Sequence, residues 1–311
     1  MNAYPYQSVS PRILAELTRI CGPENVIADE EKTLRKYAHD QVPGERYGHM
    51  PEVVVRPFDV QQVSDIVKLA NREHIPITPR AAGSGLSGGA VPIHGGIVLS
   101  VERMNRILEI DRANLMAVVE PGVVTNKLDR VLREYGLFFA GYPMIEEFCF
   151  IGGNVAENAG GGRAIKYGVT GRYIHGLELV TPGGDIVQLG GKRVKDVTGY
   201  NLVQLMIGSE GTLGIFTKIF IRLLPRPTAR KAFLALFEDA STAIGVVPEV
   251  VAAGGLIPSA IEFMDRFCFI QSVEFLKESF PTAGVGAALL LEVDGTRPEV
   301  VAEEAGIIRI D

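Results

Sequence analysis

The sequence predicts an α+β fold, in which short apolar strands, helices and glycine-rich loops follow one another. Residues 53–55 and 97–99 are runs of β-branched and other apolar residues, as in buried strands. Val60, Val63, Val67 and Ala70 recur at helical spacing between them. Strands outnumber helices from residue 51 to 227, which favours α+β over a doubly wound sheet.

The first fifty residues are expected to form a helical lead-in. Ile13, Leu14, Leu17 and Ile20 fall at helical spacing, and residues 21–23, Cys-Gly-Pro, end the run. A strand over 53–55 follows, and then a helix that Asp59 caps, with Gln62 placed to complete a capping box. Residues 75–79 form a short strand that leads into a glycine-rich segment.

Further elements follow in order up to residue 223. Strands are expected at 97–99, 117–119 and 212–223, and a hairpin at 177–189 turns at residues 182–185. A helix over 125–135 buries Leu128, Val131, Leu132 and Tyr135, and Gly136 ends it.

Residues 225–227, Pro-Arg-Pro, mark a domain boundary. Beyond it we expect strands at 232–237, 262–265 and 288–293 and a helix at 240–253. The chain is thus expected to hold a lead-in (1–50), a first domain (51–227) and a partial second α/β domain (228–311) that ends without evident completion.

Composition excludes several classes of protein. The 311 residues carry a formal net charge of −6, which argues against nucleic acid or an anionic membrane surface as the main partner. The three cysteines are widely spaced and odd in number, so no disulfide framework is indicated. The N-terminus lacks signal-peptide features, and no window is apolar enough to span a bilayer. A cytoplasmic protein, not integral to a membrane, is expected.

The first glycine-rich segment, 79–90, reads PRAAGSGLSGGA and follows a strand. Its glycines let the backbone turn tightly, and successive N–H groups can form an anion-binding concavity suited to a pyrophosphate. Taken alone, the segment is equally well a structural turn. It is not a Rossmann or a Walker loop, because the following helix and the Gly-Lys-Ser/Thr sequence are missing.

Two more glycine-rich segments occur at 151–162, IGGNVAENAGGG, and at 208–214, GSEGTLG. The first adds two asparagines, whose amides suit a flat heterocycle edged with carbonyls and ring nitrogens. Glycine-rich loops are entropically costly, so three in one domain indicate a shared ligand.

These three segments, in this order and spacing, resemble the FAD-binding domain of the vanillyl-alcohol oxidase/PCMH superfamily. The resemblance is strongest to the branch that holds the FAD-linked subunit of glycolate oxidase, D-lactate dehydrogenases and D-2-hydroxyglutarate dehydrogenase. It covers about residues 30–300. It implies a two-subdomain PCMH-type FAD-binding domain followed by an incomplete ferredoxin-like cap domain.

The resemblance also implies which residues bind FAD. The first loop would cradle the pyrophosphate, residues 120–122 and the second loop would line the flavin and ribityl chain, and residues 210–215 would lie near the ribose and adenine. The full implied set is Arg80, Ala81, Ala82, Gly83, Ser84, Gly85, Leu86, Ser87, Gly88, Glu120, Pro121, Gly122, Pro143, Gly152, Gly153, Asn154, Asn158, Ala159, Gly160, Tyr167, Gly168, Glu210, Gly214 and Ile215.

Two departures from the family matter. Relatives with covalent flavin commonly carry a histidine in the first loop, where this chain has Ser84, so noncovalent FAD is expected. Residues 142–147 replace a Pro-Asp-Pro-Ser type segment and resemble a variant found in some anaerobe lactate dehydrogenases that use electron-transfer flavoprotein. Electron-transfer flavoprotein, an iron-sulfur subunit and a quinone therefore stay open as electron acceptors.

The resemblance implies a dehydrogenase that moves hydride from a 2-hydroxy acid, such as D-lactate or glycolate, to FAD. No catalytic base can be named, and the five scattered histidines predict no metal site. Arg80 and Lys166 are candidates to contact a carboxylate or the flavin, although a solvated surface charge is the favoured interpretation for Lys166. Alternatives are an FAD-binding subunit or fragment without independent turnover, and a related flavoprotein acting on an alditol or sugar.

Overall fold

A computed structural model describes residues 6–308 except 45–46, 142, 144–146 and 254. Contacts divide the chain into two compact units. The first unit comprises Met1–Ala159 and Thr170–Leu223, and the second comprises Gly160–Val169 and Leu224–Asp311. The intervening segment Gly160–Val169 thus groups with the C-terminal residues, although it was expected within the first domain.

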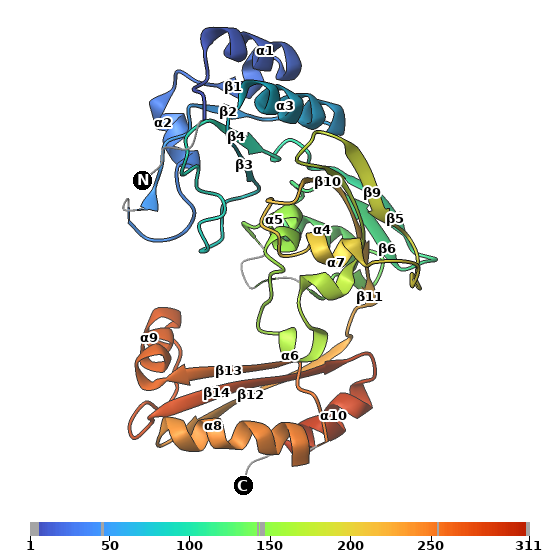
Figure 1. Cartoon of the computed structure of the whole chain (residues 1–311). Helices are drawn as coiled ribbons and strands as arrows, with labels where there is room; N and C mark the ends of the chain where they lie inside the picture. The colour runs from blue at the N-terminus through green and yellow to red at the C-terminus, as the bar shows by residue number, and fades with distance from the viewer. Residues whose placement is uncertain (1–5, 45–46, 142, 144–146, 254, 309–311) are drawn as a thin grey trace. The chain divides into compact units, whose positions relative to one another are not determined.

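The first unit begins with a four-stranded sheet in the order β1-β2-β4-β3. Strands β2 (Val53–Val55), β4 (Ile97–Ser100) and β3 (Ile77–Arg80) run parallel, and β1 (Val26–Ile27) is antiparallel to β2. Helices α1 (Pro11–Cys21) and α3 (Val60–Glu73) pack together on one face (Figure 1). The predicted lead-in helix is therefore part of this layer.

Period-two alternation decides which strand residues face which layer. Val53 and Val55 point into the core under α1 and α3, whereas Val54 faces Leu34 of α2 (Glu31–Leu34) on the opposite side. Both faces are covered, which explains why the sequence of β2 is continuously apolar.

A five-stranded antiparallel sheet in the order β5-β6-β10-β8-β9 completes the first unit. Its strands are β5 (Ile107–Asp111), β6 (Met116–Val119), β10 (Ile215–Arg222), β8 (Ile174–Val180) and β9 (Ile186–Gly190). The β8–β9 hairpin turns where the sequence predicts it. The remaining elements are α4 (Thr125–Arg133), β7 (Leu137–Phe138), α5 (Ile151–Ala156) and α7 (Leu202–Met206), with short 3-10 turns at 23–25, 35–37 and 170–173.

Three local predictions are wrong. Tyr135 is exposed, because α4 ends at Arg133 and the Tyr135 ring instead lies under the Arg112 guanidinium. The capping box is shifted: Asp59 accepts from Gln62 N, but the Gln62 side chain accepts from Phe58 N rather than from the cap itself. Residues 151–156, expected as a loop, form α5.

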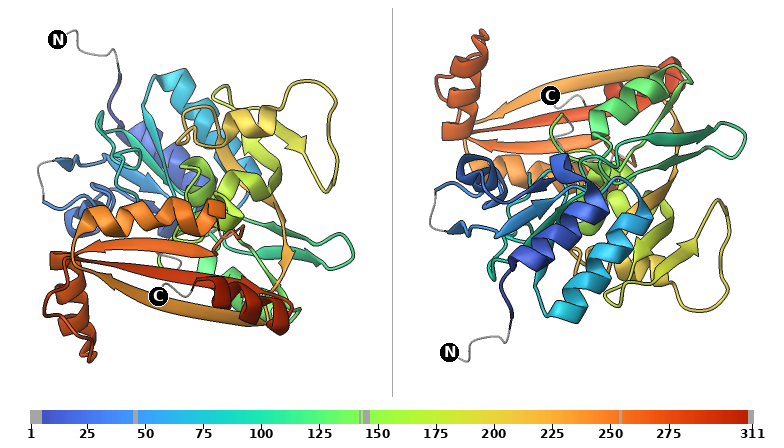
Figure 2. Two further views of the ribbon diagram at one scale, coloured as in Figure 1. Left: turned by 90° about the horizontal axis from the view of Figure 1, so that it is seen from below. Right: turned by 90° about the horizontal axis from the view of Figure 1, so that it is seen from above.

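The second unit has a three-stranded antiparallel sheet in the order β12-β14-β13. Its strands are β12 (Ala229–Phe237), β14 (Ala287–Gly295) and β13 (Ala260–Asp265), and β11 (Leu224–Pro225) precedes them. Helices α8 (Ala240–Pro248) and α10 (Pro298–Ile307) cover one face, and α9 (Arg266–Leu276) packs at the other (Figures 1 and 2). A π turn at Glu249–Ala253 follows α8, and α6 (Ala164–Tyr167) also belongs to this unit.

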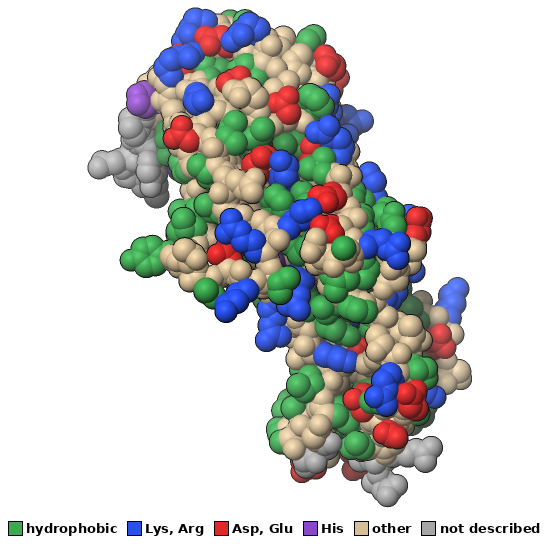
Figure 3. All heavy atoms as spheres, turned by 90° about the vertical axis from the view of Figure 1, so that its right-hand side faces the viewer, with side chains coloured by type: hydrophobic (Ala, Val, Ile, Leu, Met, Phe, Trp, Pro, Cys, Tyr) green, Lys and Arg blue, Asp and Glu red, His purple; other side chains and the backbone are tan. Residues whose placement is uncertain are grey.

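The α+β class is confirmed. No helix among the described residues has the length and apolar character needed to cross a membrane. On the face drawn in Figure 3, basic and acidic side chains are interspersed rather than gathered by sign.

Candidate functional site

A cavity in the first unit is lined by all three glycine-rich segments. Its non-atom space is about 930 Å³, a figure that includes the part open to solvent. Residues 79–85 and 89–90 line it from the end of β3 and the loop that follows. Residues 149–150, 152–154, 156–157 and 159 contribute from α5 and its flanks, and residues 210–211 and 214–216 contribute from the start of β10 and the segment before it. The structure therefore brings the three segments together around one cavity.

The first glycine loop presents unpaired backbone donors. In the described part of the chain, the N–H groups of residues 81–87 reach no hydrogen-bond acceptor. Gly83 has a φ of +68°, where a side chain is strained, and a Cβ there would collide with the Arg80 guanidinium. A run of unpaired N–H groups beside a cavity is suited to an anion such as a diphosphate.

The tip of this loop lies outside the cavity lining. Leu86 is exposed, Ser87 donates its hydroxyl to Glu210 at 3.0 Å, and the Gly88 N–H donates to Asp40 at 2.9 Å. The structure therefore places Ser87 and Gly88 in contacts that hold the loop. Arg80, Ala81, Ala82, Gly83, Ser84 and Gly85 are the members of the implied set that line the cavity here.

The second segment uses its glycines for close packing. A Cβ on Gly152 would lie 2.6 Å from Pro121 Cβ and 2.9 Å from the Pro121 carbonyl oxygen, and one on Gly153 would lie 3.2 Å from Ala81 Cβ. The Gly152 N–H donates to the Pro121 carbonyl at 2.8 Å. These glycines let α5 approach the loop that follows β6.

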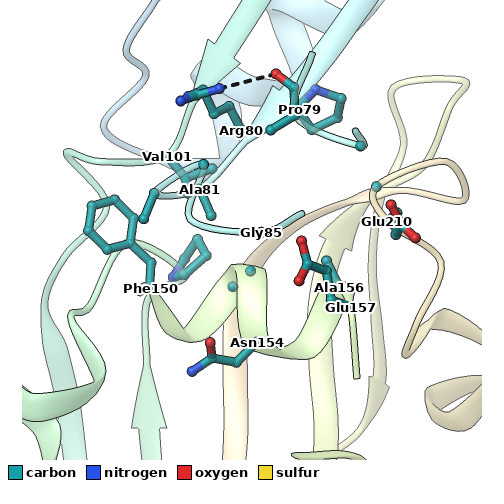
Figure 4. Close-up of a pocket in the computed structure, with 18 of the residues that line it drawn as sticks. Pro79, Arg80, Ala81, Gly85, Val101, Phe150, Asn154, Ala156, Glu157 and Glu210 are labelled. Carbon is teal, nitrogen blue, oxygen red and sulfur yellow. Dashed lines mark hydrogen bonds between the residues drawn. The ribbon is translucent and has the colours of Figure 1, made fainter. Parts of the chain in front are cut away.

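The two asparagines of this segment bond to the protein itself. Asn154 is buried and donates to the Thr125 hydroxyl at 2.8 Å, and it points away from the glycine loop (Figure 4). Asn158 has a φ of +50° and accepts from Gly171 N at 2.8 Å. Amides that were expected to face a heterocycle therefore fix the local backbone.

Some implied residues are placed away from the cavity. Glu120 is buried against Arg106, which donates to it from its backbone N and its guanidinium, and Gly122 packs on the Val101 carbonyl. Gly160, Tyr167 and Gly168 belong to the second unit and do not line the cavity. Pro121, Pro143, Ala159, Gly214 and Ile215 do line it, and the residues around Pro143 at 142 and 144–146 lie outside the described part.

Lys166 is not a solvated surface charge. Its Nζ lies 2.7 Å from Asp294 Oδ1, and the Asp294 side chain is only 2% exposed. Tyr167 donates its hydroxyl to the same carboxylate oxygen at 2.8 Å. Within the second unit, these contacts join α6 to β14, so Lys166 is a structural cation rather than a candidate for the flavin.

Glu157 is a site residue that the sequence analysis missed. Its carboxylate lies against Gly85, on the opposite side of the loop from Arg80 (Figure 4). Burial raises the pKa of Glu157, and the negative charges of Glu210 and Asp40 raise this pKa further. Other cavity residues outside the implied set are Pro79, Gly89, Ala90, Val101, Cys149, Phe150, Ala156, Gly211 and Phe216.

The cavity residues fit FAD. The loop 81–87 offers N–H donors for a diphosphate, Glu157 and Glu210 offer carboxylate acceptors for sugar hydroxyls, and Val101, Phe150 and Phe216 offer apolar walls for a ring system. No histidine, lysine or aspartate is among the described residues of the lining. No group of three or more potential metal ligands occurs in the described part of the chain either.

Comparison with known families agrees with this fit. A model described as an FAD binding domain matches residues 51–190, and one described as the C-terminal domain of FAD linked oxidases matches residues 226–310.

Two curated relatives match nearly the whole chain. Glycolate oxidase subunit GlcD of Bacillus subtilis is 40% identical over 287 residues, which cover 92% of this chain and 60% of that protein. D-lactate dehydrogenase of Anaerostipes hadrus is 37% identical over 305 residues, which cover 96% of this chain and 63% of that enzyme. The chain therefore spans less than two thirds of the length of these relatives.

A solved structure of alkyldihydroxyacetonephosphate synthase shares the fold. Its TM-score is 0.79 at 22% identity, with 98% of this chain and 59% of that chain covered. The two family matches, the relatives and the fold lead to one conclusion. The chain belongs to the FAD-linked oxidases of the vanillyl-alcohol oxidase/PCMH type, and its cofactor is FAD.

Proposed function

We propose that this chain is the FAD-binding part of a dehydrogenase that oxidises 2-hydroxy acids such as D-lactate or glycolate. One observation carries the proposal: a glycine loop whose residues 81–85 have unpaired N–H groups lines a cavity together with the other two glycine-rich segments. The names of the two relatives, a glycolate oxidase component and a D-lactate dehydrogenase, support the substrate class.

The chain's own residues would have three tasks. The N–H groups of 81–87 bind the diphosphate, Glu157 and Glu210 accept hydrogen bonds from cofactor hydroxyls, and the apolar walls exclude water from the ring system. FAD, when bound, supplies the acceptor for the substrate hydride. We further propose residues 51–227 as the FAD-binding domain and 228–311 as the cap domain.

The FAD is proposed to bind noncovalently. Ser84 lies in the cavity lining, and no histidine is among the described residues there. A serine hydroxyl is a weak nucleophile at its ordinary pKa unless a base activates it. Denaturation of the flavin-loaded protein followed by dialysis should release all the yellow colour, and flavin that stayed with the polypeptide would contradict this.

The reduced flavin is proposed to pass its electrons to an electron-transfer flavoprotein, an iron-sulfur subunit or a quinone. The resemblance of residues 142–147 to a variant in lactate dehydrogenases that use electron-transfer flavoprotein favours the first of these. Purified electron-transfer flavoprotein should be reduced in the presence of D-lactate, whereas reduction of a quinone analogue alone would favour the third. An alditol or a sugar is the alternative substrate, and the same assay with those compounds separates the classes.

A second candidate function is an FAD-binding subunit that needs another polypeptide for turnover. This candidate is favoured by the described cavity lining, whose only cation, Arg80, is turned toward backbone carbonyls rather than toward a substrate carboxylate. Oxidation of a hydroxy acid needs a cation or metal against that carboxylate and a base within reach.

Two measurements on the full chain test these proposals. Titration with FAD, followed by flavin fluorescence, should show saturable binding, and absence of saturation would contradict both candidates. Reduction of an artificial dye by D-lactate or glycolate then separates them. A complete dehydrogenase reduces the dye without any other polypeptide, whereas a subunit binds FAD but does not reduce the dye.

A further inference from the structure

Arg80 is a buried cation directly beneath the glycine loop. It is the last residue of β3, it is only 7% exposed, and burial lowers its pKa although Tyr37, Asp40 and Glu102 act in the opposite direction. An arginine stays charged even when buried. Within the described part of the chain, no carboxylate lies within ion-pair distance of this guanidinium.

The guanidinium ties together the segments on either side of the loop. It donates to the carbonyl of His39 at 2.8 Å and of Lys36 at 3.3 Å, which precede the loop-binding Asp40. It also donates to the carbonyl of Ala90, at the far end of the loop, at 3.2 Å (Figure 4). These bonds fix the geometry of the loop, but they are made to neutral carbonyls rather than to a carboxylate, so no ion pair neutralises the guanidinium directly.

The loop passes over this charge in direct contact. A Cβ at Gly83 would collide with the guanidinium, so only glycine lets the backbone come so close. The part of the unpaired run around Gly83 therefore lies next to the same cation. Donor dipoles and a buried charge together favour a bound anion more than either does alone, because a charge is screened less inside the protein.

The same contacts separate Arg80 from a role in binding substrate. Its guanidinium points away from Glu157 and Asn154, toward the strand end and the carbonyls (Figure 4). Three of its N–H donors are already taken by backbone carbonyls, which leaves fewer of them for a substrate carboxylate.

We propose that Arg80 is a positioning residue for the cofactor diphosphate, holding the glycine loop in its binding shape and placing a buried positive charge beneath the loop's free N–H groups. The inference rests on the proposed placement of the diphosphate at residues 81–87. The new element is Arg80, whose side chain acts through the loop and favours binding of the charged diphosphate part of the cofactor.

The test compares two ligands that differ in the diphosphate. Dissociation constants of FAD and of riboflavin, which has no phosphate, are measured by fluorescence for the wild type, Arg80→Met, Arg80→Lys and the control Arg130→Met. Arg130 is exposed on α4, so its replacement removes the same charge away from the loop.

Arg80→Met should weaken FAD binding on the order of 10- to 100-fold, the scale of lost charge-assisted hydrogen bonds, and leave riboflavin affinity within about twofold. Arg80→Lys keeps the charge but cannot span three carbonyls, so it should lie between wild type and Arg80→Met. Arg130→Met should match the wild type.

Several outcomes would overturn the inference. Equal losses of FAD and riboflavin affinity in the Arg80 variants would show that Arg80 only maintains the fold. Unchanged FAD affinity would show that Arg80 does not contribute to diphosphate binding. If Arg80→Met does not fold, the FAD and riboflavin affinities of Arg80→Lys decide the question in the same way. Wild-type protein that binds no FAD at all would refute the proposed function together with the inference, whereas the other outcomes leave that function intact.

Discussion

Two glycine-containing segments of the cavity have different roles in this chain: one presents free backbone donors, and the other packs a helix closely against its neighbours. The loop 81–87 leaves its N–H groups without acceptors, whereas the N–H groups of α5, apart from that of Gly153, are paired within the helix or with the carbonyls of Pro121, Val123 and Phe150. In the first segment the glycines create a vacant donor surface, and in the second they let a helix approach neighbouring backbone. Glycine content therefore indicates a site. Whether the backbone N–H groups of a segment are already paired within the protein decides whether that segment can bind an anion.

The largest effect should come from filling the space beside Gly152. Gly152→Ala gains about 1 kcal/mol of helix propensity, but overpacking against Pro121 costs about 3 kcal/mol, so we expect a net destabilisation of about 2 kcal/mol. Urea denaturation measures this loss. Gly153→Ala is the matched control, because its Cβ only meets Ala81 Cβ at 3.2 Å, and it should be close to neutral. Equal losses in both variants would show that close packing does not distinguish the two glycines.

The first loop should respond to substitution in binding rather than in stability. A Cβ at Gly85 would collide with the flexible end of the Glu157 side chain, which can move aside. The free energy of unfolding of Gly85→Ala should therefore lie within about 0.5 kcal/mol of the wild-type value. Its Cβ narrows the cradle, so FAD affinity should fall about tenfold in a fluorescence titration. A large stability loss with normal FAD affinity would reverse the roles assigned to the two segments.

A smaller effect concerns pH and Glu157, where the two segments meet. A raised pKa means that the folded chain binds the proton more tightly than the unfolded chain, so ionisation of Glu157 opposes folding. Glu157→Gln should gain stability relative to the wild type as the pH rises from about 4.5, the ordinary value, through the raised pKa. Denaturation of the flavin-free proteins at pH 4 to 8 checks this.

The control for this pH effect is a carboxylate outside the cavity. Glu134→Gln replaces an exposed residue just after α4. Its difference in unfolding free energy from the wild type should not grow as the pH rises. If the stability gained by Glu157→Gln over the wild type instead became smaller as the pH rises, the raised pKa of Glu157 would be contradicted.

Local pattern predicted most of the strands, the hairpin and the first glycine loop, because turn chemistry and alternation are set by neighbouring residues, but it missed β1, β5, β7 and β11. Glu157 could not be predicted as a cavity residue, since its approach to Gly85 depends on how α5 docks against a loop more than seventy positions earlier. The Lys166 partner, Asp294, was likewise hidden, because it depends on the register of β14. Tyr167 and Gly168 were assigned by resemblance, and in this structure they lie in the other unit.

Hydrogen–deuterium exchange with and without FAD compares the two glycine-containing segments in one measurement. We predict that amides of residues 81–87 exchange fast in the flavin-free chain and become protected on FAD binding, while amides of 154–157 are already protected. Protection of 154–157 on FAD binding, with 81–87 unchanged, would contradict the assignment of the diphosphate to the first loop.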